Sequence, residues 1–285
     1  MKILIIQECG RHEKNKNFRE ALSLQRSLTK LNCEALVWGL NYSSFNVPIN
    51  FNDFDAIINL ENYDTGWVPD LSYFNKPFKI LWSIDAHVKG IESYHRDFSE
   101  GKYNLLLQAT KDYVPNIPNS IWFPNCFDDS LIKPLDNIPK SHDIGYCGNY
   151  TTAERTALIN SVSQIFNFKK DIFVIGQDMV EAINSYKIHF NFNISNDINY
   201  RNFETIGCKT ALCTKHNHQY DELGFEDFLN CIFYEDVNEL KEKVSTLLSD
   251  KNKLESVSRS GYELSKKHTY DSRANFLLEY LKNKM

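Results

Sequence analysis

After Met1 the chain begins with the segment Lys2-Ile3-Leu4-Ile5-Ile6-Gln7-Glu8-Cys9-Gly10. Its apolar run is unbroken and ends in polar residues and a glycine, before a helical pattern begins. A buried parallel strand followed by a loop and a crossover helix has this form. Strands that alternate with helices in this way predict an α/β domain with a largely parallel sheet. Similar short apolar runs recur at residues 35–39, 56–60, 78–84, 104–108 and 120–123.

A second α/β unit follows a stretch rich in proline and aspartate between Pro124 and Pro139. That stretch has no sustained periodicity, and a new apolar strand at 143–147 comes directly after it. We therefore expect two Rossmann-like domains with parallel sheets facing a central cleft, residues 1–139 and residues 140–269. The other strands predicted in the second unit are 171–175, 188–192, 210–214 and 231–234.

The composition is that of a globular protein. Of the 285 residues, 42% are hydrophobic and 24% charged, which excludes disorder as a description of the whole chain. The formal net charge of −5 argues against nucleic acid as the main partner. The apolar runs are too short for a transmembrane segment, and no secretory signal opens the sequence, so we expect a cytoplasmic protein. Seven cysteines without a CxxC pair are typical of free, mostly buried thiols.

The loop after the strand at 143–147 is the first candidate site. Gly148 and Asn149 precede a helix that we expect from Thr152. A glycine at this place lets an anionic group approach the unsatisfied N–H groups of the helix N-terminus. A tight turn without any ligand explains the same glycine, so both interpretations stay open. No Gly-Lys-Ser/Thr follows, which excludes a P-loop, and a dinucleotide fingerprint is absent.

The second candidate is the polar segment from Asn191 to Gly207. Arg201 and Glu204 are three residues apart on its helix and therefore share a face. A carboxylate there can accept both hydroxyls of a ribose, and an arginine can hold a diphosphate. A capped amphipathic helix with an intrahelical Arg–Glu pair is the alternative.

The third candidate pair, Asp85 and His87, follows the apolar run at 78–84. A histidine beside a carboxylate can serve as a general base toward an acceptor hydroxyl, because its pKa lies near neutrality. A purely structural histidine is the alternative. Glu8, Gly10 and His12 occupy the equivalent loop after the first strand and are candidates for contact with an acceptor or a phosphate.

From Asp143 to about Leu281 the sequence resembles the CgeB/YkvP-like branch of the group 1, GT-B glycosyltransferases. The resemblance is carried by Gly145–Asn149, by Arg201-Asn202-Phe203-Glu204 with Gly207, and by His268-Thr269-Tyr270-Asp271-Ser272-Arg273. Two upstream segments, 81–87 and 122–128, also resemble that family. The resemblance implies two Rossmann-like domains, with the last helix, about 270–285, packing back on the first.

The resemblance further implies a hexosyltransferase-like enzyme that needs no cofactor and no metal. Its donor would be a nucleotide sugar, for which we favour a UDP-sugar, bound by the second domain; an acceptor glycan or other hydroxyl compound would bind the first. Glu204 would hold the donor ribose, whereas Asn196 stands where retaining enzymes have the first Glu of their Glu-x7-Glu motif. The other donor-binding residues would be Gly148, Asn149, Arg155, Ser195 and Arg201, with Asp85 and His87 acting on the acceptor.

Two alternatives compete with this interpretation. One is a phage-type glycosyltransferase that acts on modified bases in DNA, for which Lys76, Lys79, Lys89 and Lys102 would have to form a basic groove. The other is a nucleotide- or sugar-binding protein of surface-layer assembly that has no turnover, which the asparagine at position 196 favours.

Overall fold

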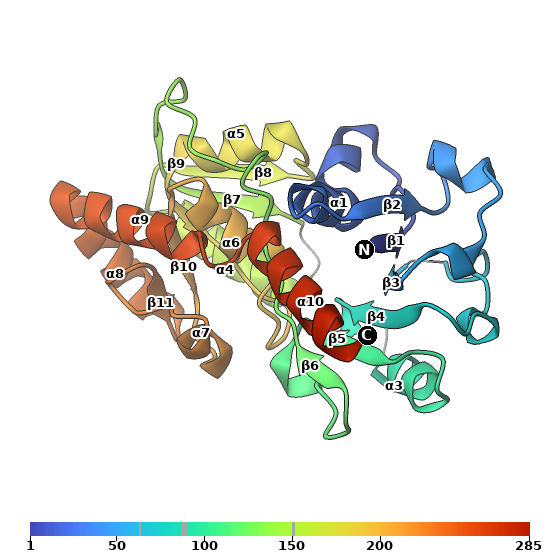
Figure 1. Cartoon of the computed structure of the whole chain (residues 1–285). Helices are drawn as coiled ribbons and strands as arrows, with labels where there is room; N and C mark the ends of the chain where they lie inside the picture. The colour runs from blue at the N-terminus through green and yellow to red at the C-terminus, as the bar shows by residue number, and fades with distance from the viewer. Residues whose placement is uncertain (63, 87–90, 150–151) are drawn as a thin grey trace. The chain divides into compact units, whose positions relative to one another are not determined.

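The computed structural model describes residues 1–62, 64–86, 91–149 and 152–285 (Figure 1). It divides the chain into two compact units. The first comprises Met1–Asn125 together with Tyr270–Met285, and the second comprises Cys126–Thr269. The division falls at the start of the proline-rich stretch, after Asn125, whereas the expected boundary follows residue 139 at its end.

The first unit is built on a parallel sheet of six strands in the order β2-β1-β3-β4-β5-β6. Most residues of these strands are apolar, and Ile3, Leu4, Ile5 and Ile6 of β1 have no exposed surface. The strands are β1 (Lys2–Ile6), β2 (Glu34–Trp38), β3 (Ala56–Leu60), β4 (Phe78–Ser83), β5 (Leu105–Gln108) and β6 (Ser120–Trp122).

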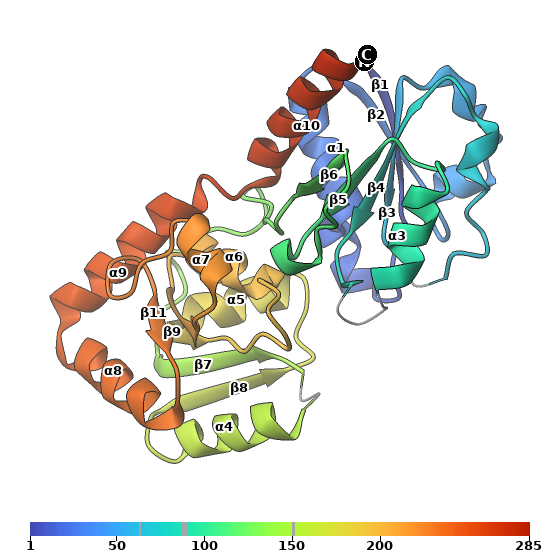
Figure 2. The same ribbon diagram turned by 90° about the horizontal axis from the view of Figure 1, so that it is seen from below.

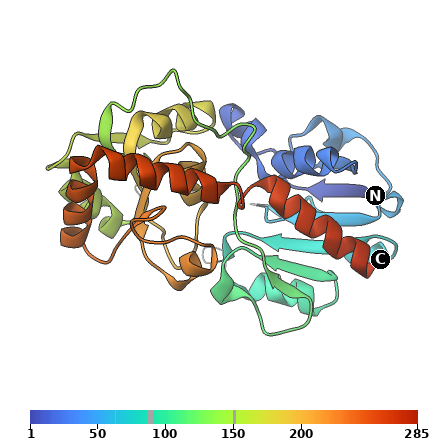
Figure 3. The ribbon, with the colours of Figure 1, turned by 60° about the vertical axis from the view of Figure 1, so that its left-hand side comes forward.

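Helices α1 (Glu20–Lys30), α3 (Ile91–Ser99) and α10 (Tyr270–Lys284) accompany this sheet. The crossover through α1 leads from β1 toward one edge and that through α3 leads from β4 toward the other, so right-handed crossovers put the two helices on opposite faces. α10 lies beside α1 (Figure 3). The remaining short helices of the unit are η1 (Glu13–Phe18), η2 (Ser43–Asn46), η3 (Phe51–Asp53), η4 (Leu71–Tyr73) and η5 (Lys111–Tyr113).

The second unit has a parallel sheet of five strands in the order β11-β10-β9-β7-β8. Its strands are β7 (His142–Gly148), β8 (Phe168–Ile172), β9 (Tyr186–Phe190), β10 (Ala211–Lys215) and β11 (Ile232–Tyr234). α4 lies on one side of this sheet, with α5 and α6 on the other (Figure 2). Its helices are α4 (Ala153–Ser163), α5 (Gln177–Ser185), α6 (Tyr200–Gly207), α7 (His218–Glu222), α8 (Val237–Ser249) and α9 (Lys251–Ser265).

One predicted strand is misplaced. The apolar pattern predicts a strand at 171–175, whereas β8 covers Phe168–Ile172. Phe173 leaves the strand with a φ of +58° and is 74% exposed. β8 is an edge strand and carries the exposed Lys169 and Lys170, so its pairing with β7 fixes its position more than its apolar pattern does.

All seven cysteines are free and buried, as their spacing predicts. DNA binding would require a basic groove. Two of the lysines expected to form it, Lys79 and Lys102, make local contacts within the first unit. Lys79 is buried, with its Nζ 3.3 Å from the Leu71 carbonyl, and Lys102 forms ion pairs with Asp97 and Glu100. Lys89 lies outside the described residues. Within the described ranges no helix combines the length and the apolar character needed to cross a membrane.

Candidate functional site

Arg201 and Glu204 stand on α6, which begins at the carboxyl end of the second sheet. Asn199 caps this helix, and its Oδ1 accepts a hydrogen bond of 3.1 Å from the Arg201 N–H. The Arg201 Nη1 forms an ion pair with the Glu204 Oε2, and its Nε donates to the Cys147 carbonyl at 3.3 Å. The two side chains therefore share one helix face, as their spacing predicts, and Arg201 ties that face to the end of β7.

This ion pair is largely enclosed but not sealed. The exposed fractions of the side chains are 23% for Arg201 and 11% for Glu204. Burial alone would lower the pKa of the Arg201 guanidinium, but the charge of Glu204 outweighs burial and raises that pKa above its ordinary value. The pair thus presents a permanent cation and a carboxylate at the sheet edge where parallel α/β proteins bind ligands.

His189 holds α6 in place from inside the unit. It is fully buried on β9, and its Nε2 accepts a hydrogen bond of 3.2 Å from the Cys147 N–H. Its Nδ1 contacts the Thr205 Oγ1, which itself donates to the Arg201 carbonyl at 2.5 Å. Burial, with a contribution from the Arg201 charge, lowers the pKa of His189 to about 3. The imidazole is therefore neutral, and because Nε2 accepts, Nδ1 carries the proton and donates to Thr205.

Arg155 is engaged with backbone carbonyls of the same edge. The residue is buried, and it donates to the Asn149 carbonyl at 2.8 Å and to the Phe192 carbonyl at 2.9 Å. Its guanidinium also lies 5.4 Å from the centre of the Phe192 ring. Arg155 thus connects the loop after β7 to the loop after β9, whereas the resemblance implies direct contact with the diphosphate.

Packing explains Gly148. A Cβ there would lie 2.7 Å from the hydroxyl of Tyr146, and that hydroxyl donates to the Asn149 carbonyl at 2.8 Å. Two other glycines of the motifs also make room for rings: a Cβ at Gly145 would lie 2.1 Å from Tyr186. A Cβ at Gly207 would lie 2.5 Å from the ring of Phe127.

Ser195 lies in a tight turn of the loop between β9 and α6. Its N–H and its Oγ contact the Asp197 Oδ1 at 3.2 and 3.4 Å. Asp197 is buried, whereas Asn196 between them is exposed. The Asn196 carbonyl accepts from Gln219 Nε2 and, at 3.4 Å, from Asn217 Nδ2. The loop is therefore held at its backbone, with the Asn196 side chain at its surface.

A cluster of amides, which the sequence analysis missed, supports this loop. Asn202 is fully buried, and its Oδ1 accepts from the Asn191 Nδ2 at 3.0 Å and from the Tyr220 hydroxyl at 2.7 Å. The Asn193 Nδ2 donates to the same hydroxyl at 2.8 Å. Asparagines are common in this chain, so nothing in the local pattern distinguishes these three from surface residues.

Two further features lie at the same sheet edge. Phe173, exposed after β8, donates its N–H to the Gly148 carbonyl at 3.4 Å. A cavity of about 400 Å³ opens at the ends of β10 and β11 and along α4, with Phe192, Lys215 and Tyr234 in its lining. The Tyr234 side chain is buried there, and its hydroxyl has no hydrogen-bond partner among the residues that the structure describes.

Asp85 is the described member of the acceptor pair. It is exposed directly after β4, and His87 lies outside the described residues. The Oε2 of Glu61, which is buried after β3, accepts the N–H groups of Ile84 and Asp85, each at 2.8 Å. Glu61 thus fixes the backbone that presents Asp85, a role that a single carboxylate after a strand does not reveal in the sequence.

A small polar cavity of about 230 Å³ lies at the loop after β1. Glu8, Gly10, Arg11, His12 and Arg19 are in its lining. The structure thus brings together the three candidates of this loop, Glu8, Gly10 and His12. In the part of the chain that the structure describes, no group of three or more His, Cys, Asp and Glu side chains could hold a metal ion.

Several solved structures are similar to this one over almost the whole chain. HepE of Anabaena, solved with UDP and glucose, has a TM-score of 0.72 at 12% identity, covering 99% of this chain and 100% of its own. Sucrose-phosphate synthase of Thermosynechococcus elongatus has a TM-score of 0.69 at 9% identity, covering 99% and 98%. An alpha-glucosyltransferase solved with UDP and a DNA 13-mer with an A:G mismatch has a TM-score of 0.70 at 12% identity, covering 99% and 100%.

At these identities the neighbours show the fold, and with the two parallel sheets they confirm the predicted GT-B architecture. No curated protein matches the sequence. The sequence model of the family described as glycosyl transferase-like matches residues 131–279, which is more than half of the 285 residues. That match includes β7, Arg155, Arg201 and Glu204 and most of α10. The chain therefore belongs to the glycosyl transferase-like family.

Proposed function

We propose that the protein is a glycosyltransferase that moves a sugar, with a hexose as first candidate, from UDP-sugar to an acceptor hydroxyl. The observation that carries this proposal is the Arg201–Glu204 pair, held at the carboxyl edge of the second sheet of a glycosyl transferase-like chain. Two structural neighbours, HepE and the alpha-glucosyltransferase, were solved with UDP, which supports UDP as the nucleotide.

In this proposal Glu204 accepts the ribose hydroxyls through the carboxylate oxygen that does not pair with Arg201. Arg201 and the N–H groups at the start of α6 stabilise the charge that develops on the diphosphate. We expect this positive charge to support transfer without a metal ion. Arg155 positions Asn149 and the loop after β9, and Ser195 shapes the turn that leads to α6.

The transfer breaks the bond between the anomeric carbon and the diphosphate oxygen, and UDP leaves. A new bond forms between that carbon and the acceptor oxygen, whose proton passes to a base. We propose Asp85, together with His87, for the acceptor side, because Glu61 fixes the backbone of Asp85. The assignment to the CgeB/YkvP-like branch and the cytoplasmic location stay predictions.

Phe173 is the residue that we add for the nucleotide base. Its ring is exposed after β8, and its backbone is bonded to Gly148. A non-glycine residue with positive φ is uncommon, and an exposed aromatic ring there is available for stacking on a base.

The decisive experiment is thermal stabilisation of the protein by a panel of nucleoside diphosphates and nucleotide sugars, with and without Mg²⁺. A ligand that binds the folded state alone raises the melting temperature with its occupancy. We expect UDP and one UDP-sugar to stabilise the protein in both conditions, and slow release of UDP from that sugar in water. No stabilisation by any nucleotide would contradict the proposed function; stabilisation without UDP release would favour the binding protein without turnover.

A further inference from the structure

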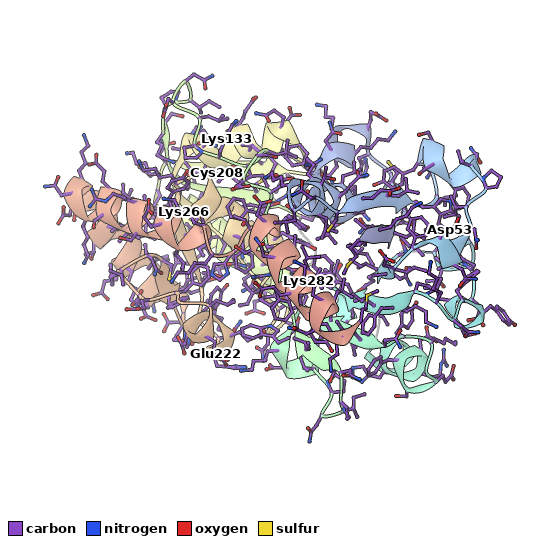
Figure 4. All side chains as sticks on the ribbon, viewed as in Figure 1. Asp53, Lys133, Cys208, Glu222, Lys266 and Lys282 are labelled. Carbon is purple, nitrogen blue, oxygen red and sulfur yellow. The ribbon has the colours of Figure 1, made fainter. Side chains whose placement is uncertain are left out.

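A second cavity lies in the same unit at the opposite edge of the sheet. Its volume is about 690 Å³, within the range of small-molecule sites. It adjoins the starts of β9 and β10 and the end of α6, at Cys208, which is labelled in Figure 4. Its lining includes five cationic side chains, those of Lys140, Lys187, Lys209, Lys251 and Arg259.

Positive charge dominates this lining. Five cations face two carboxylates, and two of the cations have acidic partners: Lys187 pairs with Asp143 at 2.7 Å, and Lys251 with Glu255 at 3.7 Å. The side chains of Lys209 and Arg259 are exposed and form no ion pair or hydrogen bond with any residue that the structure describes. The ammonium group of Lys209 and the guanidinium group of Arg259 are thus available to a ligand.

Lys140 adds a third cation to this cavity. Its stem is exposed, but its Nζ is enclosed and donates to the Thr210 Oγ1 at 2.7 Å and to the Tyr186 and Asn184 carbonyls at 2.9 and 3.4 Å. These acceptors are neutral, so within the described ranges the ammonium has hydrogen bonds but no counter-ion. Burial lowers the pKa of Lys140 to about 8. An anion in the cavity would supply the opposite charge.

The remaining wall is apolar. Leu135 and Ile138 precede β7, and Leu254 faces them from α9; all three are half-buried. A bare inorganic anion would leave this surface in contact with water. A ligand that combines an anionic group with an organic body would cover it.

We propose that this cavity binds a phosphorylated small organic molecule, with its phosphate on Lys209 and Arg259 near Lys140 and its organic part against Leu135, Ile138 and Leu254. Two unpaired cations match the double charge of a phosphomonoester better than the single charge of a carboxylate. The site lies at the amino-terminal edge of the sheet, so it is separate from the one proposed for the nucleotide sugar.

The test is calorimetric titration of the full chain with phenyl phosphate and, separately, with inorganic phosphate. The variant Lys209→Asn/Arg259→Gln removes the two available cations, and asparagine suits the positive φ of residue 209. The matched control, Lys241→Gln/Lys282→Gln, removes the same charge from α8 and from α10, where Figure 4 labels Lys282.

We expect phenyl phosphate to bind the wild type at one site more tightly than inorganic phosphate. Its affinity should fall at least about tenfold in the Lys209/Arg259 variant and stay unchanged in the control, since each lost charged contact contributes on that scale. Three results would overturn the proposal: no binding of phenyl phosphate to the wild type, unchanged binding in the variant, or equal affinity for the two phosphates. The increase in melting temperature that UDP causes should be the same in both variants. If the Lys209/Arg259 variant lost both this increase and the binding of phenyl phosphate, the phosphate would be assigned to the nucleotide-binding edge of the sheet.

Discussion

The Nδ1 of His189 contacts the Oγ1 of Thr205, and this contact joins the buried end of β9 to the middle of α6. Because Thr205 also donates to the Arg201 carbonyl, the orientation of the proposed donor-binding face depends on a residue that lies inside the core. Arg201 and Glu204 lie within the segment that matches the family, and His189 and Thr205 hold the helix that carries those two side chains.

Thr205→Val should destabilise the protein by about 1–3 kcal/mol, because the Nδ1–H of His189 would be left buried without an acceptor. Urea unfolding monitored by circular dichroism measures the change. Thr156→Val is the matched control: Thr156 makes the same bond to the carbonyl four residues earlier in α4, at 3.0 Å. Equal stability losses in the two variants would show that the histidine contact contributes nothing.

Glu204→Gln should weaken UDP binding by about 1–3 kcal/mol, since a charged acceptor for the ribose becomes neutral while the side chain keeps its shape. Fluorescence or calorimetric titration with UDP gives the affinity. Glu263→Gln changes another glutamate of an i,i+3 ion pair, between Glu263 in α9 and Lys266 just after that helix, and should leave the UDP affinity unchanged. If both variants bind UDP as the wild type does, Glu204 does not hold the ribose.

Phe173→Ala should weaken UDP binding by about 1–3 kcal/mol through the loss of stacking on the base. Tyr73→Ala, in the first unit, removes a ring that is 79% exposed and should have no effect. Stability should change little in both, because neither ring is buried. A Phe173→Ala protein with full UDP affinity would exclude the stacking role.

Deprotonation of Lys140 should raise the free energy of unfolding in alkaline solution. Its pKa is about 8 in the folded protein and near 10.4 in the unfolded chain, so the unfolded state binds more protons between these values. The free energy of unfolding should therefore increase from about pH 8 to about pH 10.4, and the cost of the enclosed charge is fully present below pH 8. Urea titrations give the free energies of unfolding of the wild type and of Lys140→Met. The value for the wild type minus that for the variant should increase with pH, and a constant difference would contradict the shifted pKa.

Periodicity in the sequence predicts the sheets and the shared face of Arg201 and Glu204 well, because these are properties of neighbouring residues. It misplaces β8, whose position comes from pairing with β7. It leaves Gly148 open between contact with an anion and a tight turn, and the Tyr146 hydroxyl adds a packing reason for the missing side chain. The contacts of Glu61 with the Asp85 backbone and of His189 with Thr205 join different strands and helices, so no local pattern contains them.

Helix α6 has only eight residues and is therefore about 12 Å long. Arg201 and Glu204 occupy its body, and Cys208 and Lys209 follow its last turn, where the basic cavity begins. A shift of this single rigid element along its axis would change both sites at once. Thermodynamic linkage then requires reciprocity: if a phosphorylated ligand at Lys209 alters the affinity for UDP, UDP must alter the affinity for that ligand by the same factor.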